Sequence, residues 1–381
     1  MESERNPAER LVARLARRSF LSLWSYANAR GKHGKELCDV LAVCDPDVVI
    51  ISVKHLAMPD TGNVSVDWQR WRRGAVDESV KQIYGAERWL RSARNVIRSD
   101  GTPGLSLPDP ARRSVHRVAV ALGSSESVPI SMGDFGKGFV HVLTEESLEV
   151  ILAEMDTVDD LTSYLTAKER FLQDLSRRVI CESEKDLLAT YLAHERQFPE
   201  GANLIVIGDD IWDGLVKRPE YVAKKEADRE SYVWDGIINH IAQYVLDNRL
   251  EFGSELNDNE LGLRVMAREG RLARRMLGKS FKEFFELARN QEVRARFVKS
   301  PSGVGYVFLA RPHGYPRDVR TAELGSRCLV VRGLHPDVVT VVGLATEQYA
   351  EGGASRSTSP TCTCLSGPPP SKSWWRRSGR S

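Results

Sequence analysis

The chain has 381 residues, of which 41% are hydrophobic and 28% are charged. This balance is typical of a folded protein with one or two domains and excludes wholesale disorder. The longest apolar run, Val48–Val53, is much shorter than the roughly 20 residues that a membrane-spanning helix requires. Six cysteines show no repeated spacing. We therefore expect reduced thiols and a cytoplasmic protein without a signal peptide or a membrane association.

Charge is nearly balanced over the chain, with 54 basic and 52 acidic residues. Binding to nucleic acid would therefore depend on local basic patches, because no global positive field supports it. Residues 351–381 differ from the rest, being rich in Ser, Pro, Gly and Arg without a helical or strand period. This composition predicts a disordered tail. The abrupt change after a strand pattern at 338–345 suggests a frame-shifted or otherwise non-native end.

The first hundred residues predict a helix, a β-hairpin and a second helix. Pro7 opens an apolar-periodic helix over 8–29, and Asp77 can cap a second helix over 77–97. Two apolar runs, 38–44 and 48–54, flank Asp45-Pro46-Asp47 and predict the hairpin. Residues 57–75 are expected to be irregular. The polar, Pro-containing stretch 99–114 predicts a boundary, so that a first domain spans 1–104 and a mixed α/β domain of unknown role spans 105–350.

In this second region, apolar periodicity predicts alternating strands and helices. Strands are expected at 115–122, 138–143, 204–207, 296–299, 304–310, 328–331 and 338–345. Helices are expected at 145–156, 159–175, 233–248 and 257–277. Four arginines at helical spacing favour a solvated or salt-bridged face over a second DNA contact: Arg264, Arg268, Arg271 and Arg275.

The hairpin carries an unusual pair of charged residues. Asp39 begins one apolar run and Lys54 ends the next, and charged groups inside a core must be solvated, paired or bound to a metal ion. Side chains alternate between the faces of a strand, so Ser52 and Lys54 share a face. A connection with an even number of residues brings Asp39 to that face as well. A four-residue loop, 45–48, would pair Asp39 with Lys54.

This arrangement resembles the PD-(D/E)XK nuclease superfamily, whose restriction-endonuclease-like fold has a helix, a hairpin carrying Asp and then (Asp/Glu)-x-Lys, and a following helix with basic or amide residues. The resemblance covers residues 5–98. It implies that Asp39 and the carbonyl of Val53 would bind Mg²⁺ or Mn²⁺, and that Lys54 would orient the attacking water and stabilise the transition state. The expected reaction is hydrolysis of DNA phosphodiester bonds in defence or repair, with RNA left open as a substrate.

Ser52 departs from the family pattern, because this position is normally acidic. The missing carboxylate could come from Glu9 in the first helix or from Glu36. Glu36 would point to the opposite face if the strand extended that far, so Glu9 is preferred.

Basic residues cluster after the hairpin, with eight basic against three acidic residues over 69–98 and aromatic residues interleaved. This pattern is typical of contacts with a phosphate backbone and with stacked bases, although a solvated helix face explains it equally well. The candidate nucleic-acid contacts are Arg70, Arg72, Arg73, Lys81, Gln82, Arg88 and Arg91.

Two other classes of function stay open. The chain could be an inactive nucleic-acid-binding module that keeps the nuclease fold and the basic patch while Ser52 abolishes metal binding, or it could have a structural or protein-interaction role. At the hairpin itself, Asp39 and Lys54 could instead form a structural ion pair. The sequence does not determine whether the protein acts alone, as a homodimer or with a partner subunit. The predicted architecture is α/β, with an N-terminal restriction-endonuclease-like α-β-hairpin-α core, a second mixed α/β region and a disordered tail.

Overall fold

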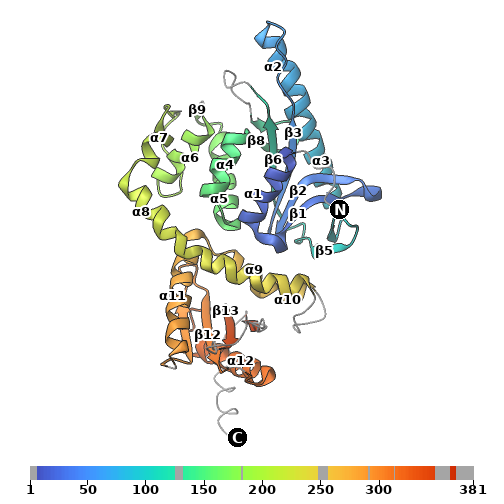
Figure 1. The fold of residues 1–381 in the computed structure, drawn as a ribbon. Coiled ribbons are helices and arrows are strands. Elements are labelled where there is room, and N and C mark those ends of the chain that lie inside the picture. Colours follow the sequence, from blue (N-terminus) through green and yellow to red (C-terminus); the bar gives the residue numbers. More distant parts are fainter. Residues whose placement is uncertain are drawn as a thin grey trace. The chain divides into compact units, whose positions relative to one another are not determined.

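The computed structural model describes residues 7–124, 132–181, 183–247, 256–290, 292–312, 314–347 and 361–365. Within it, the chain divides into two compact units, Met1–Lys224 and Lys225–Ser381. Each unit combines helices with a sheet (Figure 1), so the predicted mixed α/β class is confirmed. None of the described helices is long and apolar enough to span a membrane.

An eight-stranded mixed sheet forms the centre of the first unit, in the order β5-β4-β1-β2-β3-β6-β8-β7. The strands β1, β2 and β3 are antiparallel neighbours, whereas β3, β6 and β8 are parallel to one another. The bounds are β1 Ser25–Arg30, β2 Glu36–Cys44, β3 Asp47–His55, β4 Asn95–Ile97, β5 Pro103–Ser106, β6 Ser114–Leu122, β7 Gly133–Asp134 and β8 Phe139–Leu143. A separate parallel pair is formed by β9 (Arg178–Ile180) and β10 (Leu204–Val206).

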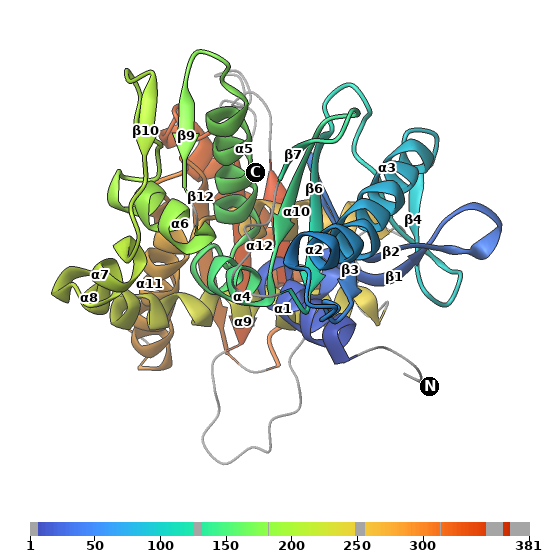
Figure 2. The ribbon, with the colours of Figure 1, turned by 90° about the horizontal axis from the view of Figure 1, so that it is seen from above.

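Helices cover both faces of this sheet. Figure 2 shows α3 on one side and α1 with α4 on the other, where Ser19 of α1 donates a hydrogen bond to Leu152 O of α4. The face under α3 carries Ser52 and Arg117, whose side chains both bond residues of that helix. The helices described in the first unit are α1 Pro7–Trp24, α2 Val64–Arg72, α3 Glu78–Leu90, α4 Glu145–Glu154, α5 Val158–Gln173, α6 Glu184–Ala193 and α7 Ile211–Val216, with a short helical turn η1 at Lys32–Gly34. The division at 224/225 falls within α8, Pro219–Asp228.

The helical stretch that follows the hairpin begins at Val64, earlier than the predicted start at residue 77. Asn63 caps α2 by accepting a hydrogen bond from Val66 N, and a π-helical turn η2, Arg73–Asp77, joins α2 to α3. Trp71 is buried and donates to Leu56 O, which anchors α2 to the end of β3. The stretch predicted to be irregular is therefore helical from Val64, because its tryptophan has a buried hydrogen-bond acceptor that sequence periodicity does not reveal.

Three further predictions about the first unit are wrong. The first helix ends at Trp24, and Ser25–Arg30 form β1 because they pair with β2. The helix predicted to reach Ile97 ends at Leu90, since β4 pairs with β5. The proposed boundary at 104/105 cuts through a single sheet, because β6 and β8 extend the sheet that the hairpin begins. The chain divides instead at 224/225.

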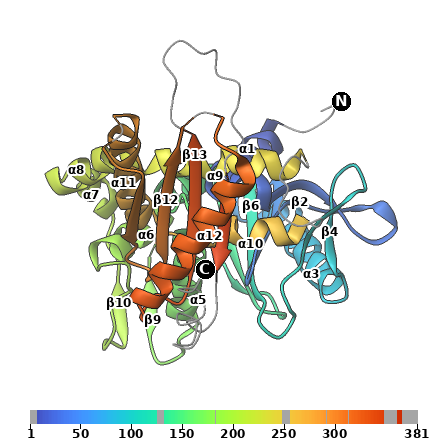
Figure 3. The ribbon, with the colours of Figure 1, turned by 90° about the horizontal axis from the view of Figure 1, so that it is seen from below.

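In the described part of the second unit, a four-stranded sheet in the order β11-β12-β13-β14 packs with the helices α9 to α12. Figure 3 shows α12 lying along β12 and β13, and its Leu324 and Cys328 pack into the apolar core against Val307 and Val341. The bounds are η3 Arg229–Ser231, α9 Tyr232–Leu246, α10 Leu256–Ala267, α11 Arg271–Arg289, β11 Ala295–Lys299, β12 Gly305–Arg311, α12 Arg317–Leu334, β13 Val341–Glu347 and β14 Thr361–Leu365.

Three predictions about this unit also differ from the structure. Residues 328–331 belong to α12, because Leu324, Cys328 and Val331 recur at helical spacing toward the core. The helix predicted over 257–277 is broken between α10 and α11, where the buried Arg274 donates to the backbone oxygens of Ala267 and Glu269. Within the predicted disordered tail, Thr361–Leu365 pair with β13 as β14, and the rest of 351–381 lies outside the described residues.

Candidate metal and nucleic-acid site

The site is built on the hairpin, whose two strands are joined by Asp45 and Pro46 alone. The register pairs Cys44 with Asp47 and Val40 with Ile51. The predicted four-residue loop and the pairing of Asp39 with Lys54 are therefore wrong by two residues. The connection still has an even number of residues, so Asp39, Ser52 and Lys54 share one face, as predicted.

Asp39 lies where β2 and β3 stop pairing through their backbones. The paired register ends at Val40 and Ile51. The next amide of β3 on the side of β2 is that of Val53, and it donates to Asp39 Oδ2 at 2.7 Å instead of to a backbone oxygen. Asp39 is only 4% exposed, so its carboxylate satisfies a buried amide. The amide and carbonyl of one residue point toward the same neighbouring strand in such a ladder, so the Val53 carbonyl is also directed toward this opening.

Ser52 is buried on the same face, with no exposed surface. Its hydroxyl donates to Gln82 Oε1 of α3 at 2.8 Å. The hairpin and the following helix, which the sequence analysis combined into one site, are therefore directly connected. Gln82 is half-buried, and its amide group is oriented by this hydrogen bond.

Lys54 is half-buried at the end of β3. It forms no ion pair with Asp39, so the structural ion pair considered as the alternative is absent between these two residues. The charge of Lys54 instead acts on Glu36, where it favours the ionised carboxylate. A half-buried lysine beside carboxyl groups can stabilise negative charge on a bound group.

Glu36 is close to Asp39, contrary to the sequence prediction. The register shifts between Ala29 and Arg30, which pair with Cys38 and Glu36, so β2 contains one extra residue there. This β-bulge changes the alternation of side chains before Asp39. Partial desolvation, a hydrogen-bonding contact with Asp39 and the negative charges of Asp39 and Glu9 together raise the pKa of Glu36.

Glu9 of α1 is near enough for its charge to act on Glu36. Over the described ranges, however, no three His, Cys, Asp and Glu side chains are arranged so that they could hold a metal ion by themselves. Mg²⁺ often takes only one or two protein carboxylates and completes its shell with water and substrate phosphate. The carboxyl groups of Asp39 and Glu36, whose charges act on each other, are the kind of hard oxygen donor that this ion prefers.

The candidate nucleic-acid residues follow one helical stretch, α2 to α3. Arg70, Arg73, Lys81, Arg88 and Arg91 are exposed. Lys81 pairs with Glu78 at 2.5 Å and Arg91 with Glu87 at 3.5 Å, and the half-buried Arg72 lies 3.8 Å from Asp77. Arg70, Arg73 and Arg88 form no ion pair in the described part of the chain, so they are available to a phosphate backbone.

The aromatic residues of this stretch have structural contacts. Trp71 is 1% exposed, and Tyr84 donates to Gly138 O at 2.6 Å. The Trp68 ring lies under the Arg72 guanidinium, 5.5 Å from its centroid. Stacking of bases on Trp71 is therefore incompatible with the structure, and the basic residues are the better candidates for contacting nucleic acid.

The arginine repeat of the second unit is a salt-bridged face, as predicted. Arg264 lies 3.5 Å from Glu260, and Arg275 lies 3.4 Å from Asp228. Arg271 is 3% exposed and bonds Asp235 at 2.8 Å. A buried arginine with a carboxylate partner does not contact DNA.

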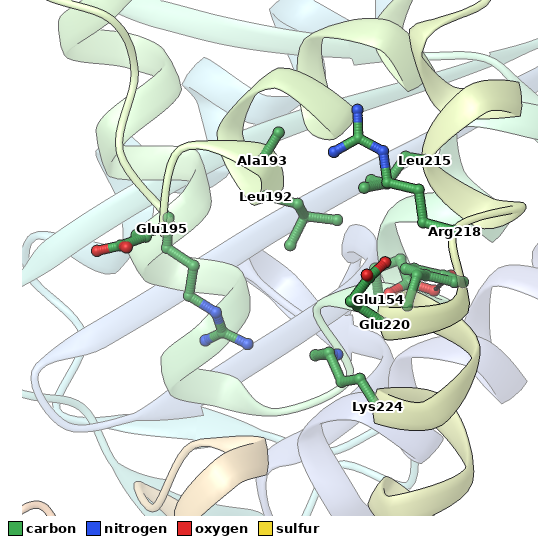
Figure 4. A pocket seen from close by; sticks show the side chains of 10 residues that line it. Glu154, Leu192, Ala193, Glu195, Leu215, Arg218, Glu220 and Lys224 are labelled. Carbon is green, nitrogen blue, oxygen red and sulfur yellow. Dashed lines mark hydrogen bonds between the residues drawn. The ribbon is translucent and has the colours of Figure 1, made fainter.

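A cavity that the sequence did not indicate lies among α4, α6, α7 and α8 (Figure 4). It has a volume of about 480 Å³, and its walls combine apolar residues such as Leu192 and Leu215 with charged ones such as Arg218 and Glu220. Glu195 and Arg196 line it with left-handed backbone, at φ 57° and 65°. None of the predicted site residues lines this cavity.

Comparison with known proteins gives no assignment for the chain. No family model matches it, no curated protein matches it, and no solved structure matches it. Any function must therefore be argued from the geometry of the hairpin site and the helix beside it.

Proposed function

We propose that the first unit is a divalent-metal-dependent nuclease that hydrolyses phosphodiester bonds of DNA. The observation that carries the proposal is the convergence of Asp39, Ser52 and Lys54 on one face, at the point where β2 and β3 separate. The resemblance to the PD-(D/E)XK superfamily supplies the expected roles. The order of helix, hairpin and basic helix supports it.

The metal ion would be held by Asp39, with the carbonyl of Val53 and the carboxylate of Glu9 as further ligands. When bound, it would polarise the phosphate and make a water molecule a better nucleophile. Lys54 would stabilise the negative charge that develops on the phosphate and orient the water. Gln82 fixes the Ser52 hydroxyl and can donate its amide protons to a phosphate oxygen.

The alternative is a nucleic-acid-binding module without cleavage. It is favoured by Ser52, which is a neutral, fully buried residue at the position that is normally acidic in the PD-(D/E)XK nucleases that the hairpin resembles. Such a protein would keep the exposed Arg70, Arg73 and Arg88 while binding metal weakly or not at all.

Nicking of supercoiled plasmid in Mg²⁺ or Mn²⁺ tests cleavage. We expect the wild type to nick DNA, and Asp39→Asn and Lys54→Gln to lose this activity. Lys217→Gln, which alters an exposed lysine at the end of α7, is the matched control and should keep it. Equal nicking by all four proteins would mean a contaminating nuclease, and a structured RNA run in parallel tests the other substrate.

Salt-dependent binding tests the basic helix separately. Each lost phosphate contact reduces the slope of log K against log salt by ~0.7–0.9. We expect a triple Gln substitution at Arg70, Arg73 and Arg88 to weaken DNA binding and to reduce that slope. Binding that persists unchanged contradicts the assignment, whereas binding without cleavage by the wild type favours the module.

A further inference from the structure

A second cavity of the first unit lies beside the start of β6. It has a volume of about 410 Å³, which is within the range of pockets that bind small molecules. Its walls come from α3, from the first residues of β6 and from one face of α5, and Figure 2 shows α3 and α5 flanking β6. All but one of the residues that line it have polar side chains, the exception being Val115. None of the hairpin-site residues lines it, so it is a separate candidate for binding a polar ligand.

The cavity lies at a part of the sheet where one edge of β6 is open. β6 pairs with β3 along its whole length but with β8 only from Val118 to Val120, so its other edge pairs with no described strand over Ser114–His116. The amide of Ser114 donates to Pro46 O, on the side of β3. Because successive residues of a strand direct their backbone groups alternately to its two sides, the amide and carbonyl of Val115 are directed toward the open edge. They offer a hydrogen-bond donor and an acceptor to a molecule in the cavity.

The charged side chains of the cavity are only partly paired with one another. Arg117 donates through Nε and Nη2 to the two carboxylate oxygens of Glu87, at 2.7 and 2.8 Å, so these two charges are balanced. Arg113 donates to backbone oxygens and forms no ion pair with a described residue. Glu169 and Arg170 of α5 both line the cavity, and neither forms a hydrogen bond or an ion pair within the described ranges. One carboxylate and two guanidinium groups are therefore left for a ligand.

This combination of charges does not suit a simple ion. Glu169 would repel an anion, and Arg113 and Arg170 would repel a cation. A fitting ligand offers hydrogen-bond donors to the carboxylate and acceptors to the guanidinium groups. Guanine does both, because its N1–H and N2 amino group can donate to one carboxylate while its O6 and N7 accept from an arginine. A phosphate adds negative charge for a further arginine, and guanidinium planes can stack on a base.

We infer that this cavity binds a guanine nucleotide, with Glu169 accepting hydrogen bonds from the base and Arg170 donating to its acceptors. The inference goes beyond the proposed function, because it requires neither a metal ion nor cleavage at the hairpin. The nucleotide is either free or an unstacked residue of a strand bound along α3. The second source is compatible with the position of Glu87, which lines the cavity and is followed in α3 by Arg88, a candidate nucleic-acid contact.

The test is calorimetric titration of the full chain in EDTA with guanosine 5′-monophosphate (GMP) and adenosine 5′-monophosphate (AMP). We expect GMP to bind at least about tenfold more tightly than AMP, since adenine offers the carboxylate only its N6 amino group. Glu169→Gln should abolish this preference, because an amide pairs well with adenine. Arg170→Gln should weaken GMP binding about tenfold, as for loss of one bidentate contact. Glu149→Gln, on the exposed side of α4, is the matched control and should bind as the wild type.

Three results would overturn the inference. They are no binding of GMP by the wild type at millimolar concentration, equal affinity for GMP and AMP, and unchanged binding in both Glu169→Gln and Arg170→Gln. A single-stranded oligonucleotide with one guanine, compared with one that has none, identifies the source of the ligand. Displacement of GMP only by the guanine-containing strand assigns the cavity to a residue of that strand, whereas selective GMP binding that neither strand displaces assigns it to the free nucleotide. Because these titrations contain no metal ion, failure of the plasmid-nicking assay leaves their outcome unaffected.

Discussion

Replacing Asp39 by alanine and by asparagine separates the structural role of this side chain from its role in binding a metal ion. Its carboxylate accepts the buried amide of Val53 at 2.7 Å. Alanine removes the acceptor and leaves that amide unsatisfied, which costs about 1–3 kcal/mol. Asparagine keeps an acceptor oxygen of the same reach, and it also removes one of the charges that repel Glu36.

We therefore expect Asp39→Ala to melt clearly below the wild type in EDTA, and Asp39→Asn to melt near it. In a folded unit of 150–250 residues, 1 kcal/mol changes the Tm by ~2–4 °C, and the first unit falls in this range. The assay is thermal unfolding followed by circular dichroism. Equal Tm values for the two variants would refute the view that the Asp39 side chain takes the place of a backbone acceptor for the Val53 amide. Asparagine is consequently the appropriate variant for the cleavage assay.

Three further predictions concern stability. Burial is the largest single influence on the pKa of Glu87 and raises it, but the hydrogen bonds and charges of Arg117 and Arg91 together outweigh burial and lower this pKa. Their stabilisation is present above the unfolded pKa and is lost as pH falls through the lower folded value. Glu87→Gln should therefore lower the Tm at pH 7 and flatten its decline in acid. Lys168→Met removes the buried positive charge that pairs with Glu184 and leaves this carboxylate only the hydrogen bond from Tyr164, which should cost about 3–5 kcal/mol in urea unfolding. Adding Glu184→Gln should recover part of this loss. Truncation after residue 347 removes β14 and exposes the edge of β13, so the second unit should melt at a lower temperature, whereas a dispensable tail predicts no change.

The hairpin could be predicted because two dense apolar runs flank a turn sequence, and the charged residues at their ends stand out. The register could not, because loops of two and four residues both bring Asp39 to the face of Ser52. Sequence alternation alone misplaces Glu36, since one extra residue opposite Ala29 leaves no mark in the local composition. Both partners of the Ser52–Gln82 hydrogen bond were candidate site residues in the sequence analysis, although the bond itself was not predicted.

The division of the chain was missed for a different reason. The polar stretch 99–114 resembles a linker, but it contains β5 and leads into β6, which pairs in parallel with β3 along its whole length. A parallel neighbour requires a long crossover, here through α2 and α3. The polar composition of 99–114, at the end of this crossover, is typical of a domain boundary, although the strands before and after it belong to one sheet.

The position of Asp39 follows from the hydrogen-bonding needs of the sheet as well as from any chemistry. Where β2 and β3 separate, the amide of Val53 loses a backbone acceptor and would be buried without a partner. An aspartate there satisfies the amide with one oxygen and retains a second oxygen with lone pairs for another ligand. An apolar side chain or a lysine at position 39 could not accept the hydrogen bond from the Val53 amide.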